Sequence, residues 1–200
     1  YDPAAHAEIA RARVDPRLRF DDFHPNYSPV IAWILAPLAA LPFLQAMAVW
    51  SAVSILLYAG AMALLARQTP HLRPDAVTFW LAVAAWPAVF MVLRYGQISS
   101  LSLVLVAGAV WLDSHGRPFL AGCVLGAVAY KPTLVMLPVL IFLGSGQWRL
   151  LAGAVSGIAG ESAISVWLAG AATFGRYLHI LANLGVHPDT VQLHPAESHS

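Results

Sequence analysis

The longest run without a charged residue constrains this chain more than any other feature. From Val30 to Ala66 the sequence contains no Asp, Glu, Lys or Arg. Such a run exceeds the roughly 20 apolar residues that one helix needs to cross a bilayer. Pro37 and Pro42 divide it, because proline interrupts the hydrogen bonds of a helix interior. We therefore predict a short helix over Pro29–Leu41, in or dipping into the membrane interface, and a full span over Phe43–Ala66.

The composition points to the same environment. Of the 200 residues, 59% are hydrophobic and 10% are charged, whereas soluble domains contain about 25% charged residues. The mean hydropathy of +0.68 agrees. We expect an all-α fold, a polytopic transmembrane helical bundle in contact with membrane lipids. The net charge of +1 argues against a nucleic-acid partner, since phosphate-backbone binding requires clustered Lys and Arg. Cys123 stands alone, so an internal disulfide is excluded.

The charge pattern divides the chain into three parts. We expect a polar segment on the outer face over 1–28, a transmembrane helical region over 29–170 that belongs to a larger membrane domain, and an interfacial helix and tail over 171–200. Arginine and aspartate are mixed in the first segment, which indicates a solvated segment and not a basic arm. The chain begins with Tyr1 instead of methionine and ends in a polar stretch, so we expect it to be truncated at both ends.

The next three helices are predicted to be short and broken. After a run over Val77–Leu93, apolar segments cover Ile98–Leu112, Phe119–Tyr130 and Leu134–Leu143, before a full span over Trp148–Gly170. The three middle segments have about 15, 12 and 10 residues, and a helix rises only about 1.5 Å per residue. They cannot cross a hydrocarbon core of about 30 Å. Some of their joints must therefore lie below the membrane surface.

The turns can be assigned to two sides of the membrane. If 1–28 is outside, the inner turns are 67–76, 113–118 and 144–149, and the outer ones are 94–97, 131 and 171–200. The distribution of arginine gives only weak support for this orientation. The joint at 113–118 is polar enough to reach water, so the recessed joints are the two on the outer side.

These recessed joints contain Arg94, Gln97 and Lys131. A charge at this depth costs about 2.5–3.5 kcal/mol on insertion scales, which favours a functional role. Two recessed cations on one side predict a phosphate site. The break at Gly96 adds free backbone N–H groups at the start of the next helix, and a helix N-terminus favours anions.

Structural explanations remain open for the same charges. Arg94 could extend to the lipid headgroups along its own apolar stem. Lys131 could do the same if 119–143 formed one continuous helix, although it would then lie near the bilayer centre. Glu161, midway along the last span, either lines a cavity or pairs with Lys131, and we favour the pairing.

Several other features are structural or absent. The pairs Gly122/Gly126 and Gly153/Gly157 have the spacing of close helix packing. The sequence contains no P-loop or dinucleotide fingerprint, no Asp-X-Asp pair and no zinc-binding histidine pattern. We predict no metal and no cofactor.

A series of short motifs runs through residues 1–150. They are Tyr1-Asp2-Pro3, Tyr27-Ser28-Pro29, Ala36-Pro37-Leu38, Leu41-Pro42, Trp50, Gly96-Gln97-Ile98-Ser99-Ser100-Leu101, Arg117-Pro118, Leu120-Ala121-Gly122, Leu125-Gly126, Lys131-Pro132-Thr133 and Trp148-Arg149. In this order and spacing they resemble glycosyltransferase family 87. Beyond Gly170 the similarity is confined to Ser198-His199-Ser200.

The resemblance implies the GT-C architecture and an activity. It implies transfer of a hexose from a polyprenyl-phosphate donor to a lipid or glycan acceptor on the outer face of the cytoplasmic membrane. Mannose is the first candidate for this hexose. The donor phosphate would bind Arg94 and Lys131, and Gln97 would orient phosphate or sugar. Tyr27 would stack on or hydrogen-bond the sugar, and His199 would assist.

The resemblance also implies a catalytic base. Family members usually have an acidic residue in the first outer loop, which takes the proton of the acceptor hydroxyl during a direct displacement with inversion. We expect this residue to lie before Tyr1. Within the chain, Asp2, Asp21 and Asp22 are candidates only by default.

Two functions outside catalysis compete with this hypothesis. Broken helices around a recessed charged site are also typical of transporters, here for an anionic solute. The sequence shows no internal repeat, which counts against a transporter. A structural or assembly subunit without activity is the third possibility.

Overall fold

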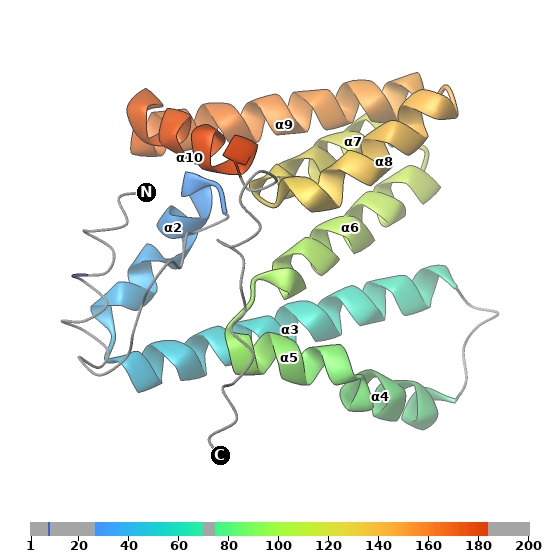
Figure 1. The fold of residues 1–200 in the computed structure, drawn as a ribbon. Coiled ribbons are helices and arrows are strands. Elements are labelled where there is room, and N and C mark those ends of the chain that lie inside the picture. The colour runs from blue at the N-terminus through green and yellow to red at the C-terminus, as the bar shows by residue number, and fades with distance from the viewer. Residues whose placement is uncertain (1–7, 9–26, 70–74, 184–200) are drawn as a thin grey trace, which may run out of the picture.

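The structure is a computed structural model that describes Glu8 and residues 27–69 and 75–183. Within these ranges the ordered elements are helices, and no strand occurs (Figure 1). They are α2 (Pro29–Leu35), η1 (Ala36–Ala40), α3 (Phe43–Gln68), α4 (Ala76–Ala85), α5 (Pro87–Tyr95), α6 (Ser99–Ser114), α7 (Pro118–Gly126), η3 (Ala127–Tyr130), α8 (Pro132–Gly144), α9 (Trp148–Ala169) and α10 (Ala171–Asn183).

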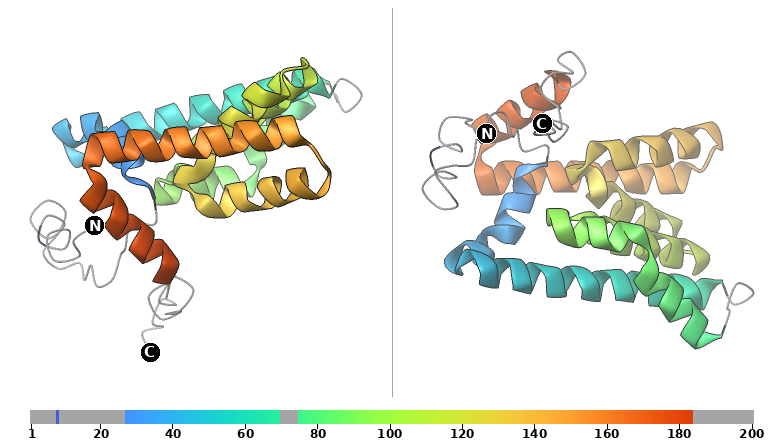
Figure 2. Two further views of the ribbon diagram at one scale, coloured as in Figure 1. Left: turned by 90° about the horizontal axis from the view of Figure 1, so that it is seen from above. Right: turned by 60° about the horizontal axis from the view of Figure 1, so that its bottom comes forward.

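The long helices α3 and α9 frame the molecule. Both are long and apolar enough to cross a membrane, and α4 with α5 forms a third candidate span that is bent by 45°. The two long helices lie on opposite sides of the bundle, and α6 and α7 lie between them (Figures 1 and 2). The predicted all-α membrane bundle is confirmed.

The short helices reach only part of the way along α3. Residues 115–117 and 145–147 lie at the same end of the bundle as Gln68, the last residue of α3, whereas the α5–α6 and η3–α8 turns lie about halfway along α3 (Figure 1). Gly116 and Gly146, with positive φ of 73° and 68°, close the two turns at that end. The structure thus groups these two predicted inner turns at the end of α3 that leads into the third, of which residues 70–74 lie outside the described residues. It places the two predicted recessed joints about halfway along α3.

The apolar run Val77–Leu93 forms two helices, α4 and α5. It breaks at Trp86, whose backbone is extended with ψ of 120°. Pro87 then begins α5. The physical reason is that the ring of proline clashes with a helical conformation of the preceding residue and removes one N–H donor.

The chain also breaks at Lys131, as predicted. The last residues before it, Ala127–Tyr130, tighten into a 3-10 turn. Lys131 itself has φ −127° and ψ 82°, and Pro132 starts α8. The alternative of one continuous helix over 119–143 is therefore wrong. In Figure 1, α7 enters from the Gln68 end and α8 returns to it, so Lys131 lies at the tip of a helical hairpin.

Helices α7 and α9 pack backbone against backbone. The predicted pairs Gly122/Gly126 and Gly153/Gly157 face each other across this contact, and a methyl group added at any of them would overlap main-chain atoms of the other helix. Small residues allow such close approach in membranes. Beside this contact, Ala109, Ala121, Leu125 and Leu150 form a buried apolar cluster with α6.

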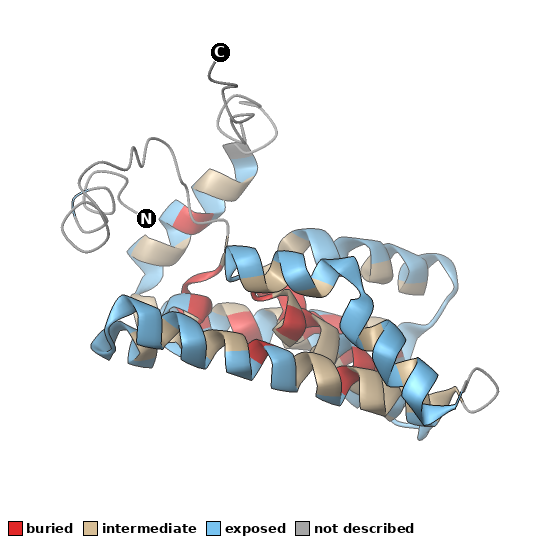
Figure 3. Ribbon diagram, turned by 90° about the horizontal axis from the view of Figure 1, so that it is seen from below, coloured by how far each residue is buried: buried red, intermediate tan, exposed pale blue. Residues whose placement is uncertain are grey.

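The outer surface of the bundle is apolar. Burial is concentrated along the middle of the molecule, while the outward faces are exposed (Figure 3). Large side chains such as Leu44 and Trp167 are 77% and 82% exposed, as expected of residues that contact lipid. At the Ala169 end of α9, Gly170 turns the chain into α10. Helix α10 covers Ala171–Asn183 of the segment predicted to be interfacial, and residues 184–200 lie outside the described residues.

Candidate functional site

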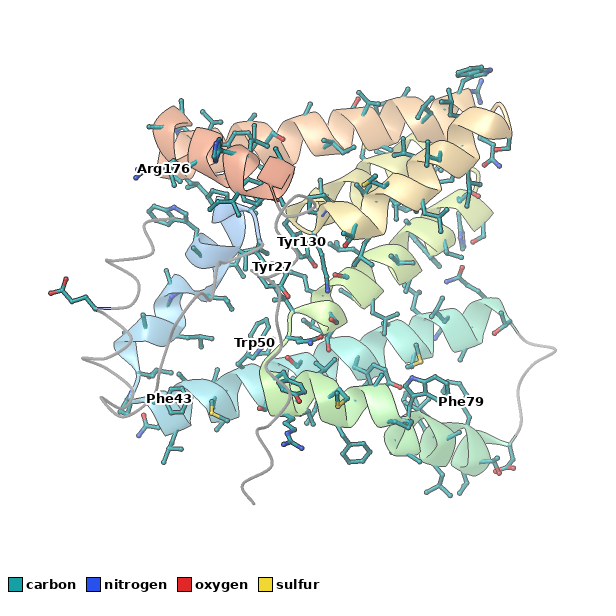
Figure 4. The ribbon with its side chains drawn as sticks, viewed as in Figure 1. Tyr27, Phe43, Trp50, Phe79, Tyr130 and Arg176 are labelled. Carbon is teal, nitrogen blue, oxygen red and sulfur yellow. The ribbon has the colours of Figure 1, made fainter. Side chains whose placement is uncertain are left out.

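Three turns from distant parts of the sequence meet at mid-depth. They are Tyr27–Ser28 before α2, Gly96–Ile98 between α5 and α6, and Tyr130–Lys131 between η3 and α8. The backbone N–H of Ser28 donates to the carbonyl of Tyr130 at 3.2 Å. Ile31, Ile98 and Tyr130 form a buried cluster, against which Tyr27 and Trp50 pack. Figure 4 shows Tyr27 and Tyr130 together near the centre of the bundle.

The α5–α6 turn is fixed by one glycine and one tryptophan. Gly96 has φ 60° and ψ 28°, a left-handed conformation that favours glycine, and it ends α5. Its carbonyl accepts a hydrogen bond from Nε1 of Trp50 on α3 at 3.1 Å. Tryptophan therefore anchors the recessed turn to the full-length helix beside it.

Tyr130 anchors the second turn. Its side chain is 3% exposed, and its hydroxyl forms a 2.7 Å hydrogen bond with Oγ of Ser102 on α6. A buried tyrosine hydroxyl requires such a partner, because an unpaired one loses the hydrogen bonds it makes to water. The tip of the α7–α8 hairpin is thereby attached to both α6 and the start of α2.

The structure brings Lys131 and Tyr27 together. Nζ of Lys131 lies 6.0 Å from the centroid of the Tyr27 ring, a cation–π geometry. Lys131 is partly buried, and it forms no ion pair with any carboxylate in the described ranges. A recessed cation that faces an aromatic ring can attract an anionic group, and the ring supplies a flat surface for a sugar.

Gln97 and Arg94 belong to the neighbouring turn. Both side chains are exposed. Gln97 accepts a hydrogen bond from Ser99 at 3.2 Å and lies next to Ile98, which packs with Tyr130. The Arg94 guanidinium lies 5.7 Å from the ring centroid of its neighbour Tyr95. The fold thus places Gln97 beside the Lys131 turn, and Arg94 lies in the last turn of α5.

Glu161 does not pair with Lys131, so that expectation is wrong. Glu161 is 8% exposed on α9 and accepts a 3.0 Å hydrogen bond from the hydroxyl of Ser165, one helical turn later. Ser165 also forms a 2.6 Å hydrogen bond with the hydroxyl of Ser28. The lysine lies against Tyr27 instead, and the serine takes the place that the ammonium was expected to fill.

An apolar cavity adjoins the α5–α6 turn. Its volume is about 500 Å³, and it lies between α3, the bent pair α4–α5 and the beginning of α6. Val89 and Trp86 are among its apolar lining residues, and Ser54, Tyr58, Ser99 and Ser100 are its hydroxyl-bearing ones. Ser54 is 2% exposed, and its hydroxyl has no hydrogen-bond partner within the described part of the chain. The cavity suits an apolar chain that lies at membrane depth.

Several predicted residues cannot be placed. His199, Asp2, Asp21 and Asp22 lie outside the described residues, as does any base before Tyr1. Among the residues that are described, no group of three His, Cys, Asp or Glu side chains is arranged to hold a metal ion.

The sequence did not reveal the residues that hold the turns together. No motif marked these residues, which are Ser28, Ser102, Ser165 and Tyr130. The one feature that could have pointed to them is the presence of serines in apolar segments, because a buried hydroxyl needs a hydrogen-bond partner. Their partners lie on other helices, at separations of 28 residues for Ser102–Tyr130 and 137 for Ser28–Ser165.

Comparison with known proteins identifies the family. No curated protein and no solved structure matches the chain. The model of glycosyltransferase family 87 matches residues 23–195. The match starts after Tyr1-Asp2-Pro3 and extends beyond Gly170, where the short motifs gave little similarity. It includes all three mid-depth turns, and it favours a transferase over a transporter. The chain therefore belongs to glycosyltransferase family 87, which indicates a membrane glycosyltransferase.

Proposed function

We propose that the protein transfers a hexose, with mannose as the first candidate, from a polyprenyl-phosphate donor to a lipid or glycan acceptor. The reaction takes place at the outer face of the cytoplasmic membrane, the side to which the sequence assigns the joints at 94–97 and 131. The observation that carries the proposal is the placement of Lys131 against Tyr27 at the meeting point of these turns.

Each residue has a role that follows from its chemistry. Lys131 binds the donor phosphate and stabilises the negative charge that grows on it as the sugar departs. Arg94 supplies a second cation from the end of α5, and Gln97 orients the phosphate or the sugar. Tyr27 offers its ring to the sugar. His199 remains a candidate assistant.

The reaction is a direct displacement with inversion. The acceptor oxygen bonds to the anomeric carbon while the bond from that carbon to the phosphate oxygen breaks. The acceptor proton passes to an acidic base, and the leaving polyprenyl phosphate keeps the bonding electrons. Within the described residues no carboxylate lies at Lys131, so the base is not assigned to one of them.

The cavity supports a lipid-linked donor over a soluble nucleotide sugar. It is apolar, lies between helices that are candidate membrane spans, and reaches Ser99 and Ser100, which directly follow the α5–α6 turn. A polyprenyl chain in this cavity would place its phosphate near Gln97 and the turns. Burial of the chain would stabilise binding by roughly 25 cal/mol per Å² of apolar surface.

The proposal is tested by a transfer assay with the protein in lipid nanodiscs. Radiolabelled polyprenyl-phosphate mannose is supplied together with a membrane lipid extract as the acceptor. Wild-type protein should transfer label, and Lys131→Ala should abolish donor use. Arg149→Ala removes an exposed cation at the far end of the bundle and should retain full activity. Full turnover by Lys131→Ala would remove this residue from the mechanism.

A further inference from the structure

Ser28 is held from two directions at the start of α2. Its backbone N–H donates to the carbonyl of Tyr130 at 3.2 Å. Its hydroxyl lies 2.6 Å from the hydroxyl of Ser165 on α9. Ser28 and Ser165 are 1% and 0% exposed. The residue before Ser28 is Tyr27, so the position of the ring that faces Lys131 depends on these two contacts.

The hydrogen bonds run in one direction. The hydroxyl of Ser165 donates its single proton to Oε1 of Glu161. Ser165 can then only accept from Ser28, so the hydroxyl of Ser28 must be the donor in the shorter bond. The chain therefore runs from Ser28 through Ser165 to Glu161, and the carboxyl group is its final acceptor.

Two other serines, one on α9 and one at the end of α8, behave differently. Ser156, on the same helix α9, donates to the carbonyl four residues earlier at 2.8 Å, and Ser145 does the same at 2.7 Å. This is the usual behaviour of serine in an apolar helix. Ser165 donates to the side chain of the residue four positions earlier instead. Glu161 thus directs this hydroxyl away from the backbone of its own helix.

The buried carboxyl group of Glu161 is energetically unfavourable if its only role is to join two helices. Burial of an ionised carboxylate costs several kcal/mol unless it is paired, and within the described ranges no cation pairs with Glu161. Two serines alone could link α2 to α9. The carboxyl group is therefore expected to contribute more than attachment, namely a defined direction and position of the hydrogen bonds.

We propose that Glu161 is a positioning residue that, through Ser165 and Ser28, holds Tyr27 against Lys131. The inference rests on the proposed function for its kinetic effect, but the geometric effect is independent of it. Misplacement of a binding group by about 1 Å costs on the order of 100-fold in rate. The effect should fall on kcat, because Lys131 itself still binds the donor.

Kinetics in nanodiscs test the positioning role. Glu161→Ala and Ser165→Ala should lower kcat by about 10- to 100-fold and change KM for the donor by less than about 3-fold. Glu161→Gln keeps an acceptor oxygen and should retain at least about a third of the wild-type kcat. Ser156→Ala, on the same helix but bonded to its own backbone, is the control and should match wild type.

Two kinetic outcomes would overturn the proposal. If Glu161→Gln were as inactive as Glu161→Ala, Glu161 would act through its charge or proton and not through position. The double variant Ser28→Ala/Glu161→Ala should lower kcat by less than the product of the two single fold-losses, because residues in one hydrogen-bonded chain do not have additive effects on free energy. A fold-loss in kcat equal to that product would mean that the two residues act independently.

A second measurement does not depend on transfer activity. In a Cys123→Ser background, Tyr27→Cys and Lys131→Cys are joined by a short thiol-reactive crosslinker. The yield should fall at least about 3-fold when Glu161→Ala is added, and Ser156→Ala should leave it unchanged. An unchanged yield with Glu161→Ala would overturn the positioning role while the transferase proposal stood. Absence of transfer by wild type, together with the expected loss of crosslinking, would overturn the transferase proposal alone.

Discussion

Two halves of the bundle are packed in opposite ways. In the packed half, α7 and α9 touch through glycines, and one added methyl group would overlap the backbone of the facing helix. In the open half, α3, α4, α5 and α6 surround a cavity of about 500 Å³. The glycines on α3 and α6, Gly60 and Gly108, have no atom within 4 Å of an added methyl group.

The difference in packing suggests that the two halves contribute differently to the site. Lys131 lies at the end of η3, which continues from the packed α7, so its position is set by contacts that resist change. Arg94 and Gln97 follow the bent span of the open half, which leaves room for an apolar molecule. We infer that the packed half holds the reacting phosphate and that the open half accommodates substrates.

The largest expected effect lies in the packed half. In Gly157→Ala the new methyl group overlaps the carbonyl oxygen of Cys123 and lies 2.9 Å from Cα of Gly126. Backbone cannot yield as a flexible side chain does, so we expect a loss of at least about 1–3 kcal/mol in unfolding free energy. Unfolding in mixed detergent–SDS micelles, followed by tryptophan fluorescence, measures the loss.

The matched control lies three residues further along α9. At Gly160 an added methyl group has no neighbour within 4 Å, and alanine is a better helix former than glycine by about 1 kcal/mol. Gly160→Ala should therefore be as stable as wild type or more stable. Equal losses from the two variants would show that the helix contact is not the reason.

The second prediction tests the open half. Ala82→Leu adds a larger side chain at an exposed position in the wall of the cavity and should cost less than about 1 kcal/mol of stability, because the space exists. It should raise KM for the polyprenyl-phosphate donor by about 10-fold, the equivalent of about 1.4 kcal/mol of binding. Ala82→Ser should change neither value. Severe unfolding of Ala82→Leu would mean that the two halves are equally packed.

A smaller effect is expected where the open half meets the site. Trp50→Phe removes the hydrogen bond to the carbonyl of Gly96, which is worth about 0.5–1.5 kcal/mol. We expect kcat/KM for the donor to fall by about 2- to 10-fold, because the α5–α6 turn loses its anchor. Trp167→Phe, on an 82% exposed residue of α9, should have no effect. Wild-type kinetics for Trp50→Phe would show that the turn is held without α3.

The smallest effect is expected at the start of α4. Asp75 accepts hydrogen bonds from the hydroxyl of Thr78 at 2.6 Å and from its N–H at 2.9 Å. These bonds, that from the hydroxyl first, lower the pKa of Asp75 below its ordinary value of 3.8. Their stabilisation is present above that value and is lost as the pH falls through the lowered pKa.

The corresponding measurement compares Asp75→Ala with wild type. Thermal unfolding should begin slightly earlier in the variant at pH 7, because the exposed helix α4 loses its N-terminal cap. The difference should shrink once the pH is low enough to protonate Asp75 in the folded protein. A difference that grew in acid would contradict the capping role.

The sequence predicted the outline of the fold because segment lengths and prolines are local signals. The full spans, the short helices and the break at Lys131 all followed from counting apolar residues against the bilayer thickness. The bend at Trp86 lies inside a 17-residue apolar run whose length resembles one span, and Pro87 is the local signal for the break.

The contacts of the site were less predictable. Glu161 and Ser165 are visible as neighbours on one helical face, but Ser28 is 137 residues from its partner Ser165. A single sequence does not show which distant side chain a buried group meets. The choice of Lys131 as the partner of Glu161 followed from charge alone, and the fold used serine hydroxyls instead.

The hairpin of α7 and α8 has a consequence for how the protein is made. Its arms are too short to leave the translocon as spans. Helix α7 starts at the Gln68 end of the bundle and α8 ends there (Figure 1). The glycines that hold α7 face α9, which is synthesised later. We therefore expect the hairpin to stay at the membrane surface during synthesis and to insert into the bilayer only after α9 has been inserted. A ribosome-stalled chain that stops before Trp148 should leave Cys123 open to a water-soluble maleimide, and release of the chain through α9 should protect it.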